Sequence, residues 1–293
     1  MIEFLASLVT LGFLAQALRI AVPYVLAALG GTITEKSGVV DLALEGKLLM
    51  GAFAAAVVTY ETGSITLGIV AAALAGAAVA AVQAVWSVYL RADQVVTGVA
   101  INLGAIGLTR YLLGVRYGQG ANSPRIDGVG TGVLTNPLSW IALVATAAIV
   151  LGVMHTRLGL RVRAVGERPE AVAAAGVSVA RTRWLALLLG GALTGLGGAQ
   201  LSLTVNGFVA EMSGGRGYVA LAAVILAGWR PGRAALLCLA FGVADAVQYR
   251  LQTRGFGLPH ELVRLLPYVL TLALLALWPR RVQPPAALGD PPT

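Results

Sequence analysis

The chain has 293 residues, of which 58% are hydrophobic and only 12% are charged, and its net charge is +8. Water-soluble domains are about 45–50% apolar and about 25% charged, so this composition excludes an ordinary soluble protein and indicates a chain solvated largely by lipid. The positive charge does not indicate a nucleic-acid partner, because nearly all the basic residues are arginines between apolar stretches, where such residues set membrane topology.

Apolar segments follow one another along the whole chain. Several are shorter than the roughly 20 residues that a helix needs to cross a bilayer, so we expect some helices to be tilted, broken or re-entrant. Arg19 and Pro23 could divide the first into a surface helix and a short span. The segments lie at residues 4–33, 39–59, 65–90, 94–114, 138–154, 184–206, 217–229, 234–248 and 262–278. They predict an all-α, polytopic membrane helix bundle of about eight to ten spans.

The same pattern predicts a single transmembrane domain, residues 1–281. Its segment at about 155–183 carries six arginines against two glutamates, and loops rich in arginine stay in the cytoplasm. Counting spans from that segment puts the polar loop at 117–137 outside. The proline-rich tail, residues 282–293, is expected to be disordered.

Three ionisable residues open the second apolar segment: Asp41, Glu45 and Lys47. Each charge would cost about 2.5–3.5 kcal/mol at the bilayer centre, so these residues must lie near the interface, pair with one another or line a wet cavity. On one helix Asp41 and Glu45 would share a face, and Lys47 would lie off it. Two interpretations stay open: acids at the positive end of a helix dipole, or residues that shape a translocation pathway or gate.

Neutral polar residues recur in later segments. Gln94, Thr97 and Asn102 lie along one apolar helix, where they could receive an uncharged polar solute. Interhelical hydrogen bonds, worth about 0.6 kcal/mol each, would explain them equally well, and Asn206 and Asp245 have the same ambiguity. The candidate translocation pathway is therefore Asp41, Glu45, Lys47, Gln94, Thr97, Asn102 and Asn206. The predicted spans contain no ladder of acids for proton or sodium coupling, which disfavours a secondary transporter.

A glycine-rich run, residues 190–198, lies within one apolar segment. Small residues let helices approach closely in lipid, where packing drives association, so the run predicts a helix–helix contact face. The alternative is a flexible break in the helix beside a translocation path.

The motifs of several enzyme classes are missing. Residues 30–38 suggest a phosphate-binding loop at first, but Glu35 stands where such a loop needs glycine. The two histidines, His155 and His260, lie at segment ends, and the single cysteine, Cys238, excludes an internal disulfide and a cysteine-cluster metal site. We therefore expect no catalytic residue, no metal, no cofactor and no enzyme activity. If ATP drives the protein, a partner must hydrolyse it.

Two blocks of sequence carry a family resemblance. The first, residues 35–53, begins Glu35-Lys36-Ser37-Gly38 and continues Asp41-Leu42-Ala43-Leu44-Glu45-Gly46-Lys47. The second, residues 159–171, is followed by Ala175-Gly176-Val177 and Arg183-Trp184. In order and spacing the chain resembles, from about residue 20 to 280, the permeases of ABC importers in the branched-chain amino acid, simple sugar and nucleoside group. It is most similar to the shorter nucleoside-type permease.

The resemblance implies a role for the second block. In the family this region is similar to a coupling helix, which docks into a groove of the cytoplasmic ATPase. Pro169 suits a first helical turn, Glu170 complements the helix dipole, and Gly176 can end the helix. The alternative is an ordinary surface loop. The implied coupling residues are Gly166, Glu167, Arg168, Pro169, Glu170, Ala171 and Gly176.

The resemblance also implies partners and a location. These are a second, different permease, a cytoplasmic ABC ATPase, and an extracytoplasmic substrate-binding lipoprotein, around a multi-pass protein of the bacterial inner (plasma) membrane. Nucleosides are the implied solute, with simple sugars or branched-chain amino acids as the alternative and an ion-coupled carrier as the rival class. In the longer partner permease, asparagine is more often found at the Asp41 position and methionine at the Lys47 position.

Overall fold

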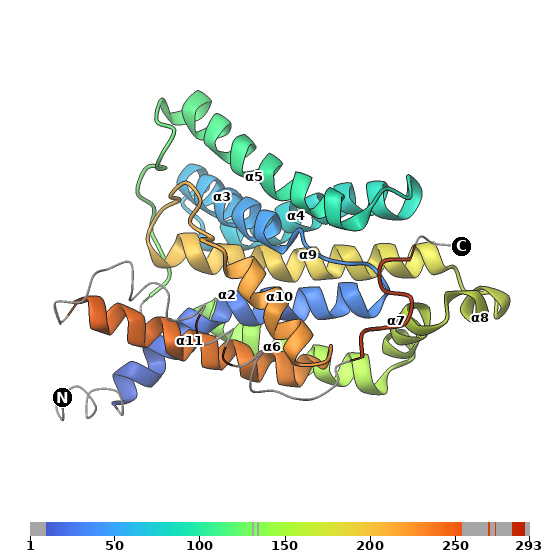
Figure 1. Cartoon of the computed structure of the whole chain (residues 1–293). Coiled ribbons are helices and arrows are strands. Elements are labelled where there is room, and N and C mark those ends of the chain that lie inside the picture. Colours follow the sequence, from blue (N-terminus) through green and yellow to red (C-terminus); the bar gives the residue numbers. More distant parts are fainter. Residues whose placement is uncertain are drawn as a thin grey trace.

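The computed structural model describes residues 10–130, 132–133, 135–253, 269, 273 and 283–290. Every regular element among these residues is a helix, and the long helices lie roughly side by side in one bundle (Figure 1). A π-helical turn, Val85–Tyr89, extends α4. The long helices are α2 (Leu11–Lys36), α3 (Leu44–Thr62), α4 (Ile65–Ala84), α5 (Gln94–Tyr117), α6 (Pro137–His155), α9 (Val179–Thr204) and α11 (Pro231–Thr253), and the short ones are α7 (Arg157–Glu167), α8 (Pro169–Ala174) and α10 (Arg216–Leu226).

Six helices in the described part of the chain are long and apolar enough to cross a membrane: α2, α4 with its π-helical turn, α5, α6, α9 and α11. Helix α3 has 19 residues but carries Glu45, Lys47 and Glu61, and α10 has only 11 residues. Of the predicted segment 262–278, only residues 269 and 273 are among the described residues. The all-helical bundle is thus confirmed, whereas the count of eight to ten spans is not.

Helix α2 is continuous through Pro23, so the predicted division of the first segment is wrong. Proline cannot donate the hydrogen bond that the carbonyl of Arg19, four residues earlier, would accept. The side chain of Gln200 on α9 reaches this carbonyl instead, with its Nε2 3.4 Å from the oxygen. Neighbouring helices commonly satisfy such freed groups within a membrane bundle.

The bundle has two ends, which we name the α8 end and the opposite end. The last residues of α2 and α6, the first residues of α9 and both short helices α7 and α8 gather at the α8 end (Figure 1). At the opposite end the loops 118–136 and 205–215 meet. An antiparallel bridge joins Asn122 to Val209 there, and the Ser123 amide donates to the Phe208 carbonyl at 2.9 Å. The loops at 117–137 and 155–183 therefore lie at opposite ends, as their sequences predict.

Helix α9 runs through the middle of the bundle, and its glycines meet the backbones of three other helices. A Cβ on Gly190 would press on Gly30 of α2, one on Gly191 on Gly76 of α4, and one on Gly198 on Leu48 of α3. The helix continues unbroken from Val179 to Thr204. The predicted helix–helix contact face is confirmed, and the alternative of a helix break is wrong.

This close packing predicts that Gly195→Val lowers the stability of the folded protein. A Cβ at Gly195 would collide with the carbonyl oxygen of Ala72, and a helix backbone cannot move aside as a flexible side chain can. We expect a loss of about 1–3 kcal/mol in stability, measured as a lower thermal unfolding temperature of the purified protein in detergent. Gly104→Val is the matched control, because a Cβ there meets nothing within 4 Å. Equal unfolding temperatures for the two variants would contradict the role of this contact.

Residues 283–290 return to the α8 end and pack there. The Ala287 amide donates to the Gly166 carbonyl at 2.8 Å, and the Gly289 amide to the Gly38 carbonyl at 3.1 Å. Ala287 is buried. Of the tail 282–293 expected to be disordered, the described residues 283–290 are thus packed. Residues 286–289 are small or apolar, and the Ala287 and Gly289 amides find backbone acceptors on α7 and the α2–α3 loop.

Candidate functional site: an exposed helix pair and a buried polar network

Helices α7 and α8 form a pair joined at Arg168, and their ends follow local sequence rules. Pro169 occupies the first turn of α8, where its missing amide proton costs nothing, and Glu170 lies in the same turn. Gly176 adopts a φ of +79°. Its amide donates to the Ala173 carbonyl at 2.9 Å, and the Val177 amide to the Val172 carbonyl at 3.2 Å. This is a Schellman motif, so Gly176 ends the helix as predicted.

The helix pair is anchored at one point and free beyond it. No residue of α8 is buried, and α8 projects from the bundle at its end (Figure 1). Gly166, near the end of α7, is by contrast buried. A Cβ on Gly166 would touch the Lys36 carbonyl at the end of α2. Of the predicted coupling residues, Gly166 therefore makes the packing contact that fixes α7, while Glu167, Arg168, Glu170, Ala171 and Gly176 are exposed.

The loop 37–43 connects this anchor to α3. Its centre, Val40, is held from both sides: Gln94 Oε1 accepts from the Val40 amide at 2.7 Å, and Gln83 Nε2 donates to the Val40 carbonyl at 3.2 Å. Arg183 of α9 donates from Nε to the Ser37 carbonyl at 3.1 Å. The loop is thus an irregular segment whose polar backbone groups have defined partners, as burial in a membrane protein requires.

Asp41 and Lys47 form a salt bridge inside the bundle. Lys47 Nζ lies 2.6 Å and 2.8 Å from the two Asp41 carboxylate oxygens, and both side chains are fully buried. Helix α3 begins only at Leu44, so Asp41 stands before the helix. The prediction that Asp41 and Glu45 share a helix face, with Lys47 off it, is therefore wrong. The non-helical loop lets Asp41 turn toward Lys47, and Glu45 points elsewhere.

Glu45 binds the N-terminus of another helix, α10. Its Oε1 accepts from the Gly215 amide and its Oε2 from the Gly217 amide, both at 2.7 Å. Amides at a helix N-terminus are unpaired and carry partial positive charge, which a carboxylate neutralises. The interpretation of an acid at a helix dipole is therefore partly right, but the helix is α10 and not the one that carries Glu45.

Helix α10 starts within the bundle and runs to the α8 end. Its 11 residues span about 16 Å, about half of a hydrocarbon core of about 30 Å. Just beyond its last turn, Trp229 Nε1 donates to Glu35 Oε2 at 2.5 Å, and Glu35 Oε1 accepts from the Asp41 amide at 3.3 Å. The non-helical residues 205–215 precede it, so this is a broken helix of the kind expected from the short segment 217–229.

The comparison with known proteins gives the family. Residues 13–275 match the model of the branched-chain amino acid transport system permease component. The chain belongs to this permease family. It is 34% identical to the nucleoside ABC transporter permease protein NupC of Lactococcus lactis, with 94% of each chain covered. It is 31% identical to the guanosine ABC transporter permease protein NupQ of Bacillus subtilis, with 92% of this chain and 93% of NupQ covered.

A further relative, TsgC13 of Haloferax volcanii, is named as a candidate glucose ABC transporter permease. It is 35% identical over 84% of this chain and 80% of its own. No solved structure matches the chain significantly. By its family the chain is a transporter permease component, and its six long apolar helices fit a multi-pass membrane protein.

The remaining predicted pathway residues of the permease are dispersed. Asn102 belongs to the buried network: its Oδ1 accepts from the Gly46 amide at 2.7 Å, and its Nδ2 donates to the Leu42 carbonyl and to the Tyr218 hydroxyl. Thr97 donates its hydroxyl proton to the Asp93 carbonyl one turn earlier. Asn206 is exposed at the opposite end with a φ of +58°. Gln94, as described, holds the loop 37–43.

Asp245, whose role the sequence left open, belongs to a second polar cluster of the permease, with Tyr24 and Arg216, which the sequence did not predict. Tyr24 donates its hydroxyl proton to Asp245 at 2.7 Å, and Arg216 lies 3.9 Å from the same carboxylate. Arg216 could have indicated it, because an arginine at the start of a short apolar segment is costly at membrane depth unless it has a partner. Beside this cluster a cavity of about 310 Å³ opens, and its polar lining side chains are Gln16, Arg19, Gln200, Thr204, Arg216 and Tyr249.

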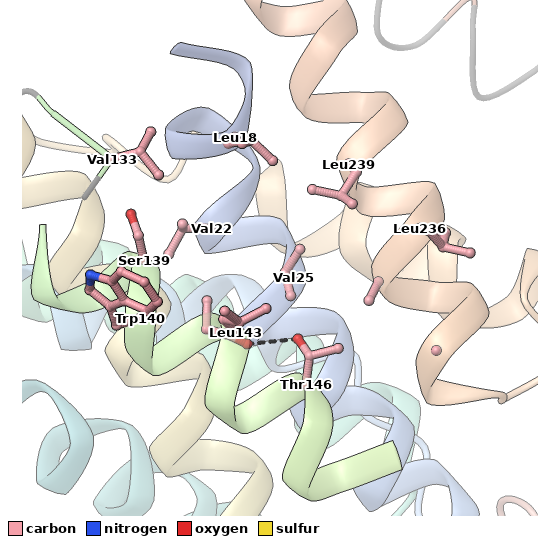
Figure 2. A pocket seen from close by; sticks show the side chains of 13 residues that line it. Leu18, Val22, Val25, Val133, Ser139, Trp140, Leu143, Thr146, Leu236 and Leu239 are labelled. Atoms are coloured by element: carbon pink, nitrogen blue, oxygen red, sulfur yellow. Dashed lines mark hydrogen bonds between the residues drawn. The ribbon is translucent and has the colours of Figure 1, made fainter. Parts of the chain in front are cut away.

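An apolar cavity of about 370 Å³ lies between α2, α6 and α11. Figure 2 shows its lining, which is mainly aliphatic and includes Trp140 and Leu143 on α6 and Leu236 and Leu239 on α11. Thr146 contributes little polarity, because its hydroxyl donates to the Ala142 carbonyl at 2.7 Å. This cavity therefore suits hydrocarbon and not a polar solute.

Proposed function

We propose that this chain is the membrane-spanning subunit of an ATP-driven, binding-protein-dependent importer of nucleosides. The observation that carries the proposal is the helix pair α7–α8: an exposed, capped helix held at the end of a bundle whose family consists of transporter permeases. The similarity to two nucleoside-type permeases over more than nine-tenths of this chain supports the choice of solute.

The α8 end faces the cytoplasm in this proposal, because the segment 155–183 concentrates arginine. A separate ABC ATPase binds α8 there. A second, different permease completes the pathway, and a lipid-anchored binding protein delivers solute at the opposite end. The assembly lies in the bacterial inner membrane.

A short series of contacts connects α8 to the helices inside the membrane. Gly166 packs so close to the Lys36 carbonyl, next to the loop that holds Asp41, that a Cβ there would collide with it. Beyond the Asp41–Lys47 pair, Glu45 accepts hydrogen bonds from the N-terminus of α10. We propose that α7, the loop 37–43 and α10 move together when the ATPase closes.

The buried network transmits this movement and does not contact the solute. Each of these side chains bonds to a partner within the chain: Asp41, Glu45, Lys47, Gln94 and Asn102. The polar cavity beside Arg216 is better suited to the solute, since its lining offers hydrogen-bonding groups next to aliphatic ones. Thr204 lines it, and the Thr204 hydroxyl is buried with no partner among the described residues.

The test is uptake by the complete transporter in proteoliposomes. With the second permease, the ATPase and the binding protein present, labelled guanosine or uridine should accumulate only when ATP is supplied. Unlabelled nucleosides should compete, and glucose or leucine should not. Uptake that needs an ion gradient but no ATPase would establish the rival class of carrier.

Glucose is the second candidate solute, because TsgC13 of Haloferax volcanii is also similar to this chain. The same experiment decides between them. Competition by glucose but not by nucleosides would assign the permease to sugars.

A further inference from the structure

The segment 283–290 forms part of the surface at the α8 end. Two backbone hydrogen bonds, Ala287 to Gly166 and Gly289 to Gly38, hold it, and the Arg183 side chain donates from Nη1 to the Asp290 carbonyl at 2.7 Å. It therefore touches α7 and the loop 37–43 at once, the two elements that the proposed function couples.

Arg183 is the anchor of this arrangement. Its side chain is fully buried, and it joins the Ser37 carbonyl to the Asp290 carbonyl. A buried arginine is costly unless its donors are used. Here two separate segments supply backbone acceptors to Nε and Nη1, while Nη2 has no hydrogen-bond partner among the described residues. The two bonds fix the position of the C-terminal segment relative to α9.

The segment and α7 together line a hollow of about 390 Å³. Pro285 forms one side, and Lys36, Arg163 and Glu167 supply the charges. Lys36 also lies within electrostatic range of Arg230. The hollow is thus predominantly positive, with a single acid among its lining residues.

Arg163 needs an acceptor that the described part of this chain does not supply. Its Nε is buried and has no hydrogen-bond partner among the described residues, and its Nη2 makes only a 3.4 Å contact to the Met154 carbonyl. Arg163 lines the hollow, so a carboxylate entering it would pair with the terminal Nη groups of the guanidinium and complement the positive charge.

We propose that the C-terminal segment, residues 283–290, forms part of the surface to which the ATPase binds. The basic hollow beside α7 then receives an acidic side chain of the ATPase. The inference rests on the proposed function, because it takes the ATPase to bind at α8. The hollow is continuous with α8 through Glu167 and Arg168, so one partner can contact both. Arg183 acts as a positioning residue that keeps the wall in place.

The experiment measures how much ATPase stays bound to the permease pair during purification in detergent. Arg163→Glu should reduce the retained ATPase about tenfold or more, because two like charges would then face each other. Removal of residues 283–293 should cause a similar loss, since one wall is gone. Arg161→Glu is the matched control on the same helix: it is exposed and does not line the hollow, so retention should stay within about twofold of the wild type.

Thermal unfolding of each variant checks that the permease itself is intact. Retention of the ATPase by both test variants would overturn the inference, as would equal losses for Arg161→Glu and Arg163→Glu. Loss of bound anionic lipid from Arg163→Glu, with ATPase retention unchanged, would assign the hollow to lipid and also overturn it. A wild-type permease that retains no ATPase would instead refute the proposed function.

Discussion

Replacing Gly176 by valine is expected to abolish solute uptake while the permease still inserts and still binds the loaded binding protein. Gly176 has a φ of +79°, a conformation that a β-branched residue rarely adopts. The substitution would remove the motif that ends α8, and a helix of six residues cannot hold its shape without such an end. We expect uptake at least about tenfold lower, which corresponds to about 1.4 kcal/mol in coupling.

Gly63→Val is the control, because Gly63 has a similar φ of +65°, ends α3 at the opposite end and has no neighbour within 4 Å of a Cβ. Its uptake should stay near the wild-type rate. Glu170→Arg should act like Gly176→Val, since Glu170 is exposed and its reversal changes the docking surface without disturbing the bundle. Uptake that survives both changes would show that α8 is not the coupling helix.

Replacing Lys47 by methionine is expected to destabilise the permease strongly. Asp41 would keep its charge in a fully buried position with no cation beside it, and breaking a buried pair in this way costs about 3–5 kcal/mol. Thermal unfolding and the yield of monodisperse protein in detergent measure the loss.

The double variant Asp41→Asn with Lys47→Met separates stability from function. It removes both charges and keeps similar volumes, so most of the lost stability should return. Uptake should also recover to within a few-fold if the pair only holds the loop 37–43 against α3, as proposed. A folded double variant that does not transport would show that the charges themselves act in translocation.

Features that are set by residues close together in the sequence can be predicted from it. Apolar length and composition predict the helices, and the glycines of α9 predict a contact face, because small residues have the same packing consequence wherever they lie in a bundle. Pro169 and Gly176 predict the ends of α8 through rules that span only a few residues.

Such local rules could not predict the buried polar network, because its partners are far apart in the sequence. Glu45 meets Gly215 and Gly217, and Glu35 meets Trp229, across separations of about 170 to 194 residues. Helical periodicity describes only neighbours on one helix, so it placed Asp41 and Glu45 on a common face that does not exist. The prolines near the C-terminus predicted disorder for the same reason, because the acceptors for Ala287 and Gly289 belong to distant segments.

The coupling mechanism requires α8 to lie on the cytoplasmic side of the membrane, and labelling of single cysteines measures that side. Cys238 is the single cysteine and is buried, so Ala173→Cys on exposed α8 and Ala121→Cys at the opposite end can each be labelled with a membrane-impermeant maleimide. If α8 faces the cytoplasm, Ala173→Cys reacts only in inside-out vesicles and Ala121→Cys only in intact cells. Labelling of Ala173→Cys from outside intact cells would put α8 beyond the reach of any cytoplasmic ATPase and would contradict the coupling mechanism.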